Sequence, residues 1–146
     1  MSNRKLSNMK ELTLSISILL FSLIASAQYN YTQVSNVDKV DISYKWRNTK
    51  LFDTDSPLEL AIKLKNRNDS SVQVSFSVDY YINGLLDGTT KIEEFCIKKN
   101  KTARGEYNGL LLTSEGKTEE LVTSDEFKVE FNSIDIKKVP SCNEKE

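Results

Sequence analysis

The amino-acid sequence predicts an all-β domain, an antiparallel sandwich of two sheets with about seven strands, behind a secretory signal peptide. Three observations predict this class. Several stretches alternate apolar and polar side chains, most clearly residues 71–84, "SVQVSFSVDYYING", and a period of two is typical of a half-buried strand. No stretch after residue 27 keeps the roughly 3.6-residue period of an amphipathic helix. Both prolines, Pro57 and Pro140, lie outside the alternating stretches, as ladder hydrogen bonding requires.

Residues 1–27 have the pattern of a signal peptide. A basic start is followed by an apolar run at residues 12–25 and by the small-x-small end Ala25-Ser26-Ala27. The apolar run is shorter than the about 20 residues that a membrane-spanning helix needs; an uncleaved anchor is the alternative. Residue 28 is Gln and not the Cys of a bacterial lipoprotein. We therefore expect a secreted or periplasmic protein that is not integral to the membrane after cleavage.

The remaining chain is expected to form one domain. Residues 28–37 are polar and tyrosine-rich, and form either a loose N-terminal segment or a short edge strand. The domain itself is expected at 38–139, and residues 140–146 form a C-terminal tail. Its first two strands are predicted at 40–46 and 58–64, with the apolar side chains of each in alternate positions. Trp46 is in phase with the first of these strands and is expected in the core.

The compact turn "NRNDSS" (66–71) leads directly into the long alternating stretch. Asn and Asp in such a turn bond their own backbone or adopt positive φ. Residues 58–83 are therefore predicted to form a β-hairpin. Gly84 and Gly88 are expected in the turn that ends it.

The second half of the chain is less regular. The strands predicted at 90–97 and 127–136 both change phase, at Glu93-Glu94 and near Asn132-Ser133, and each change indicates a β-bulge. Between these strands we expect a charged loop at 98–106, a strand or buried loop at 107–114, and room for one helical turn at 115–126.

The run "LELAIKLKNRNDSSVQVSFSVDYYING" resembles the second and third strands of immunoglobulin-like and fibronectin-III-like modules of bacterial envelope and secreted proteins, and "CIKKNKTARGEYNGLLL" resembles the strand and turn that follow. The resemblance covers roughly residues 38–139. It departs from antibody domains, because Trp46 precedes these strands and the two cysteines lack the inter-sheet spacing. It implies an Ig-like sandwich that binds or spaces other domains, and it carries no catalytic residue across.

Composition excludes several function classes. The chain has 20 basic and 21 acidic side chains, interspersed, so no stretch is basic enough to predict nucleic-acid binding. It has no histidine, which removes Ser-His-Asp and Cys-His catalysis and the commonest transition-metal ligand. The adjacent carboxylates Glu93-Glu94 and Glu119-Glu120 would point to opposite faces of a strand, whereas a glycosidase needs two that converge. We expect no cofactor and no enzymatic activity.

Candidate sites are few. The polar face of the long strand offers Ser75, Ser77, Asp79 and Tyr81 as binding residues, and the loops at 53–57 and 84–90 are alternatives. Tyrosine favours recognition because it gives contact area at little entropic cost. The oxygen ligands of Asp53, Asp55 and Glu59 make a weak calcium candidate, with a turn capped by Asp side chains as the alternative.

Cys96 and Cys142 are the two cysteines of the chain. In an exported protein they could form a disulfide, which would stabilise the fold by roughly 3–4 kcal/mol. The alternative is a buried Cys96 and an unrelated thiol in the tail.

The preferred hypothesis is a non-catalytic binding, adhesion or structural module whose partner is an envelope or extracellular protein or a glycan. An accessory subunit or inhibitor of an envelope enzyme is the alternative, and predicts an apolar docking patch. A carboxylate-dependent hydrolase is a third possibility.

Overall fold

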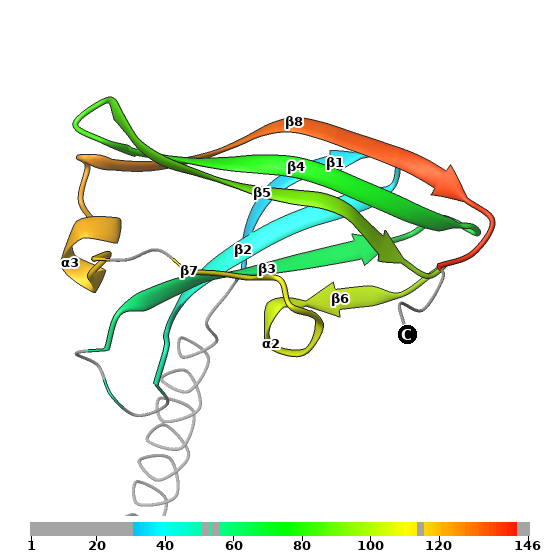
Figure 1. Cartoon of the computed structure of the whole chain (residues 1–146), viewed down its shortest axis with the longest axis horizontal. Coiled ribbons are helices and arrows are strands. Elements are labelled where there is room, and N and C mark those ends of the chain that lie inside the picture. The colour runs from blue at the N-terminus through cyan, green and yellow to red at the C-terminus, as the bar shows by residue number, and fades with distance from the viewer. Residues whose placement is uncertain (1–30, 51–52, 54–55, 114–115, 143–146) are drawn as a thin grey trace, which may run out of the picture. The chain divides into compact units, whose positions relative to one another are not determined.

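The computed structural model describes residues 31–50, 53, 56–113 and 116–142, which form two antiparallel sheets packed face to face (Figure 1). The first sheet contains β1 (Thr32–Val37), β2 (Val40–Asn48), β3 (Leu58–Asn66), β6 (Thr102–Arg104) and β7 (Leu111–Thr113); the second contains β4 (Ser71–Ile82), β5 (Leu85–Ile97) and β8 (Phe127–Val139). Two single-turn helices complete this part of the chain, α2 (Gly105–Asn108) and α3 (Glu119–Val122). The predicted all-β sandwich is confirmed. The predicted signal peptide, residues 1–27, lies outside the described residues.

The strand order places the alternating stretches in the middle of each sheet. The first sheet runs β1-β2-β3-β6, with β7 also paired to β3, and the second runs β5-β4-β8. The long strand β4 is therefore central, and every second side chain on it is buried. Completely buried side chains from both sheets form the core, namely Val40, Ile42, Leu60, Ile62, Leu64, Val72, Val74 and Val78. Burial of such a side chain contributes about 1.5–3 kcal/mol.

Aromatic side chains extend this core toward one end. The Trp46 ring lies 6.4 Å from the Tyr80 ring and 5.8 Å from the Phe127 ring, centroid to centroid. Farther along, Tyr44 on β2 stacks on Phe131 of β8 at 5.6 Å. Pairs of this geometry add about 0.5–1.5 kcal/mol to the area they bury. Trp46 thus packs against the core as expected.

The hairpin predicted over residues 58–83 is wrong. β3 pairs with β2, whereas β4 pairs with β5 and β8, so the turn after β3 crosses from one sheet to the other. The alternation of a strand shows which side chains are buried but not which strand lies beside it. The hairpins of the described chain are β1–β2, β2–β3 and β4–β5 instead.

Other local expectations had mixed outcomes. Both bulges are present: the register of β4 shifts between Val74 and Phe76 against β5 and between Ser75 and Ser77 against β8. Glu94 and Ser133 in the partner strands have positive φ of 50° and 53°. The helical turn predicted at 115–126 is α3. Gly88, however, lies inside β5 and not in a turn. The expected charged loop contains β6 and the start of α2. Of the two expectations for residues 28–37, the edge strand is confirmed by β1 at Thr32–Val37, which belongs to the first sheet, so the sandwich begins before residue 38.

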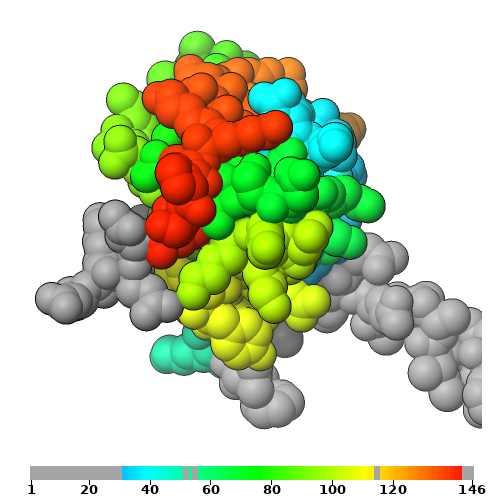
Figure 2. Space-filling model, turned by 90° about the vertical axis from the view of Figure 1, so that its right-hand side faces the viewer, coloured from blue at the N-terminus to red at the C-terminus, as the bar shows by residue number. Residues whose placement is uncertain are grey.

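Two buried asparagines close one end of the sandwich. Asn66, 1% exposed, donates from Nδ2 to the carbonyls of Ser70, Ile97 and Lys98 at 2.9, 3.2 and 3.2 Å. Asn68 donates its backbone N–H to Asn66 Oδ1 at 2.9 Å and its Nδ2 to the Asp38 carbonyl at 2.8 Å. In Figure 2 the turns tied together here lie side by side, in cyan, green and yellow-green. Backbone groups in a turn that crosses between two sheets have no neighbouring strand to bond to, and the two asparagine side chains supply hydrogen bonds in its place.

The edge beside β3 is interrupted by α2. β6 pairs with residues 63–65 of β3, Leu110 bonds to Ile62, and β7 pairs with residues 59–61. Residues 105–109 between them fold over the outer surface of the sheet, where they cover Ala61, which is completely buried. Gly105 permits this approach, because a Cβ on it would lie 2.8 Å from the Leu110 carbonyl oxygen and 3.2 Å from Ala61 Cα.

Candidate functional site

The outer surface of the second sheet holds three of the predicted binding residues in a hydrogen-bonded row. Asp79 accepts from the Thr89 hydroxyl at 2.7 Å and from Asn132 Nδ2 at 2.8 Å. Ser77 donates to the Asn132 carbonyl at 3.3 Å, and Ser75 accepts from the Glu94 backbone N–H at 3.0 Å. These side chains therefore join β4 to both of its neighbours, and their hydrogen-bonding groups are directed into the sheet.

The fourth predicted residue, Tyr81, lies farther along β4, at the end of the β4–β5 hairpin. Tyr81 pairs with Leu86 across the two strands, and Ile82 pairs with Leu85. Leu85 is 75% exposed and Leu86 is 59% exposed. We call residues 81–86 the hairpin tip. Since successive side chains of a strand point to opposite faces, the tip carries apolar side chains on both of its faces.

Asn83 and Gly84 make the turn of the hairpin tip. Their φ values are 51° and 76°, which is the left-handed pair that a two-residue hairpin loop requires and that Asn-Gly adopts most readily. The Asn83 backbone N–H also donates to the Glu126 carbonyl at 2.8 Å. The turn is therefore fastened to the segment that precedes β8.

A partly buried ion pair supports the base of the hairpin tip. Asp87, in the irregularity of β5, binds the Lys117 ammonium. The Lys117 side chain is only 9% exposed and its nitrogen lies 6.0 Å from the centre of the Tyr80 ring. The Lys117 carbonyl also accepts from the Leu58 N–H at 3.2 Å. These contacts connect the hairpin to the first sheet just below the tip.

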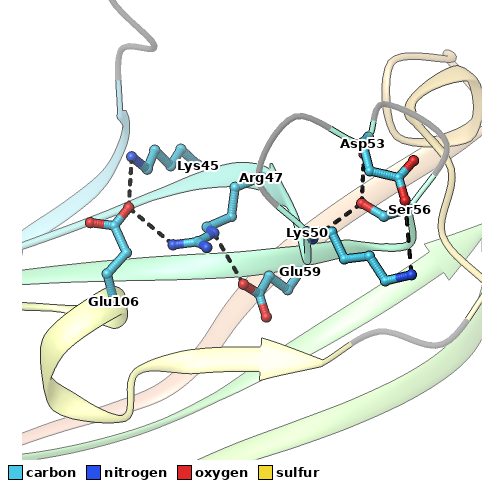
Figure 3. A network of polar contacts seen from close by, with 7 residues as sticks. All are labelled: Lys45, Arg47, Lys50, Asp53, Ser56, Glu59 and Glu106. Atoms are coloured by element: carbon cyan, nitrogen blue, oxygen red, sulfur yellow. Dashed lines mark hydrogen bonds and ion pairs between the residues drawn. The ribbon is translucent and has the colours of Figure 1, made fainter.

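The outer surface of the first sheet is predominantly basic. Strand parity and register place five basic and two acidic side chains on it: Lys45, Arg47, Lys63, Lys65 and Arg104, with Asp41 and Glu59. The helical turn α2 adds Glu106, which lies 3.0 Å from Lys45 Nζ and 3.4 Å from Arg47 Nη1, and Glu59 lies 3.0 Å from Arg47 Nε (Figure 3).

The carboxylates of this surface are shared among its cations. The hydrogen bond from Lys45 is the largest influence on Glu106, and with the charge of Arg47 it lowers the pKa of that carboxyl despite partial burial. Asp41 binds Arg67 at 2.6 Å. Lys63 has an aromatic partner instead: its nitrogen lies 4.2 Å from the centre of the Tyr31 ring, on which Lys45 also lies, at 5.0 Å.

The weak calcium candidate is only partly described. Glu59 is ion-paired with Arg47, and Asp53 lies 3.9 Å from Lys50 and accepts a hydrogen bond from Ser56 through its carbonyl (Figure 3). Asp55 lies outside the described residues. Within the described part of the chain, no group of three His, Cys, Asp or Glu side chains is placed to hold a metal ion.

Cys96 and Cys142 form a disulfide, with their Cα atoms 5.6 Å apart. It joins the far end of β5 to the segment after β8 and so braces the end opposite the hairpin tip. A pocket of about 360 Å³ opens near this end, lined by Asp38, Lys39, Asn68, Val72, Ile136 and Lys138.

The sequence analysis named the loop at 84–90, which contains Leu85 and Leu86, as an alternative binding region, but the apolar character of this tip and the basic surface of the first sheet were missed. Leu85 and Leu86 are adjacent leucines directly after an Asn-Gly turn, where alternation would place one of the two in water, and this could have indicated an exposed apolar tip. The basic surface has no linear signal, because its cations are scattered over residues 45–104 and only register brings them together.

Comparisons with known proteins give little further information. No family model matches the chain, and no curated protein matches it in sequence. Among solved structures, the trimeric lipoprotein SadB of Salmonella enterica is similar over 93% of this chain and 79% of its own, with a TM-score of 0.43 and 11% identity. No shared function follows from a similarity of this degree. None of the described helices is long and apolar enough to span a bilayer.

Proposed function

We propose that this protein is a non-catalytic, secreted or periplasmic binding module that docks an envelope or extracellular protein on its hairpin tip. The observation that carries the proposal is the exposure of Leu85 and Leu86, at 75% and 59%, on adjacent positions of one strand. Leu86 is paired with Tyr81 on one face of the tip and Leu85 with Ile82 on the other, and apolar side chains that stay in water in this way are typical of docking sites. The location rests on the basic, apolar and small-residue pattern of residues 1–27.

The supports of the tip favour recognition over a flexible loop. An Asn-Gly turn, a backbone bond to Glu126 and the Asp87–Lys117 pair hold it in one conformation. A preorganised tip loses little entropy when it binds. Tyr81 and the two leucines would then be the apolar anchors that dominate the affinity of such interfaces.

An accessory subunit or inhibitor of an envelope enzyme is a special case of the same proposal. That hypothesis requires an apolar docking patch, which the hairpin tip supplies. Membership of the sandwich in the Ig-like class is also part of the proposal, and it rests on sequence pattern alone.

A pull-down from the native host with the secreted protein tests the proposal. We expect the Leu85→Ser, Leu86→Ser double variant to lose the partner that the wild-type protein retains. Its melting temperature should stay within about 2–4 °C of wild type, since surface changes are worth about 0.5 kcal/mol. Tyr107→Ser is the matched control, because Tyr107 is 80% exposed on α2. Equal retention of the partner by wild type and double variant would refute docking at the tip.

A further inference from the structure

The basic outer surface of the first sheet has more cations than its carboxylates can pair. Glu106 forms ion pairs with both Lys45 and Arg47, Glu59 pairs with Arg47, and Asp41 pairs with Arg67. These three carboxylates come from β2, β3 and α2, so each lies toward a different part of the surface.

Lys63 and Arg104 are left beside each other. They are directly paired across β3 and β6, a position where side chains are about 4.5–5.5 Å apart at Cβ and where like charges destabilise a sheet. Among the described residues neither forms an ion pair with a carboxylate: Lys63 lies on the Tyr31 ring, and Arg104 is exposed. Lys65 follows Lys63 on the same face, about 6.7 Å farther along the strand.

An exposed aromatic ring lies three residues after Arg104 in the chain, on the helical turn that follows β6. Tyr107 is 80% exposed and projects from α2, which begins directly after Arg104. Asn108 of the same helical turn accepts from the Arg104 backbone N–H at 2.9 Å. A tyrosine ring offers an apolar face with a polar edge, which suits the ring of a sugar.

We infer that Lys63 and Arg104 form an anion-binding pair for an acidic polysaccharide, with Lys65 as a further cation and Tyr107 as a platform for a sugar ring. An anionic group between the two cations would relieve their repulsion and gain charge-assisted hydrogen bonds from both. Regularly spaced anions along one chain would reach Lys65 as well. This surface is separate from the hairpin tip, and the inference does not rest on docking there.

The chemistry favours a polysaccharide over an acidic protein. Protein partners bind chiefly through buried apolar anchors, and the large exposed apolar side chains among the described residues other than Tyr107 are Leu85 and Leu86, at the tip. Around Lys63 and Arg104 the surface offers charges, hydroxyl groups and the aromatic rings of Tyr31 and Tyr107.

The test is binding of the purified secreted protein to immobilised polygalacturonate, heparin, poly-L-glutamate and neutral dextran at low salt. We expect binding to one or both acidic polysaccharides, at least tenfold weaker binding to poly-L-glutamate, and none to dextran. The Lys63→Gln, Arg104→Gln double variant should bind about tenfold or more weakly, since two charge-assisted hydrogen bonds are worth at least about 1.4 kcal/mol together.

The matched control removes the same charge from the other sheet. Lys91 and Lys128 lie on β5 and β8, and Lys91→Gln, Lys128→Gln should change polysaccharide affinity less than twofold. Tyr107→Ser should weaken polysaccharide binding severalfold. Leu85→Ser, Leu86→Ser should leave polysaccharide affinity unchanged, whether or not the hairpin tip docks a protein. Arg104→Gln alone is the test if the double variant fails to fold, because Arg104 is exposed and its side chain has no polar partner among the described residues.

Three results would overturn the inference. Equal weakening by the two double variants would show a general attraction to polyanions. Poly-L-glutamate binding as tight as polysaccharide binding would show an acidic-protein site. Absence of binding to every acidic polymer would show that the cations are only solvated.

Discussion

We expect substitution of Asn66 to destabilise the fold more than substitution of any other side-chain amide in or beside the described turns. Its side chain, at the last position of β3, is 1% exposed and donates to three carbonyls where the chain begins to cross between the sheets. Asn66→Ala leaves the Ile97 carbonyl and the Asn68 backbone N–H without these bonds, and both bonds are buried. The other two carbonyls, of Ser70 and Lys98, are partly buried and regain water more easily.

The expected loss follows from these groups. A buried polar group left unsatisfied costs about 1–3 kcal/mol, so two of them predict a loss of about 2–6 kcal/mol for Asn66→Ala. This is a large part of the about 5–15 kcal/mol that stabilises a typical domain. Asn66→Asp should be at least as severe at neutral pH, because it sets a carboxylate against three carbonyls. Burial would raise the pKa of that new carboxyl, so this variant should regain stability as pH falls.

Urea unfolding with the disulfide intact measures the effect. We expect a lower midpoint with an unchanged m-value, which reports lost stability without a change in the surface exposed. Asn108→Ala is the matched control, because Asn108 makes an exposed bond to the Arg104 backbone, and we expect a loss of about 0.5 kcal/mol or less. If Asn66→Ala and Asn108→Ala differ by less than about 1 kcal/mol, the asparagine closure is not the stabilising feature that its geometry indicates.

Three further outcomes follow from other contacts. Cys142→Ser should lower stability by about 4 kcal/mol in the chain-entropy model, from the sequence separation of 46 residues that the disulfide spans, and reduction of the wild-type protein should shift the urea midpoint equally. Gly105→Ala should cost about 1–3 kcal/mol, because its Cβ would lie 2.8 Å from the Leu110 carbonyl oxygen, and a melting temperature within 2 °C of wild type would contradict this. The lowered pKa of Glu106 stabilises the fold above the unfolded-state value of about 4.3, and this contribution is lost as pH falls through the folded-state pKa. Glu106→Gln should therefore be less stable than wild type by about 0.2–1 kcal/mol at pH 7, and the two should converge in urea titrations at lower pH.

Alternation in the sequence was sufficient to predict the buried faces of β3 and β4. Every second side chain faces the core as expected, from Val72 to Tyr80 on β4 and from Leu58 to Leu64 on β3. The two phase changes correctly located the bulges at Glu94 and Ser133. Burial and bulges are local properties of one strand, which is why one strand's sequence records them.

Pairing and surface chemistry depend on distant residues, and here prediction failed or was incomplete. A compact turn looks the same whether it joins neighbours in one sheet or crosses to the other, so the turn after Asn66 was misassigned. Asp79 is bonded to residues 10 and 53 positions away, and nothing near it in sequence indicates this. The adjacency of Lys63 and Arg104 likewise arises from register alone.

Crosslinking in the native host tests the central proposal most directly. A photoreactive phenylalanine analogue in place of Leu86 should give one discrete adduct with an envelope or extracellular protein after irradiation. The same analogue in place of Tyr107, which is similarly exposed, should not capture that protein. Adducts of the same protein from both positions, or none from position 86, would contradict docking at the hairpin tip.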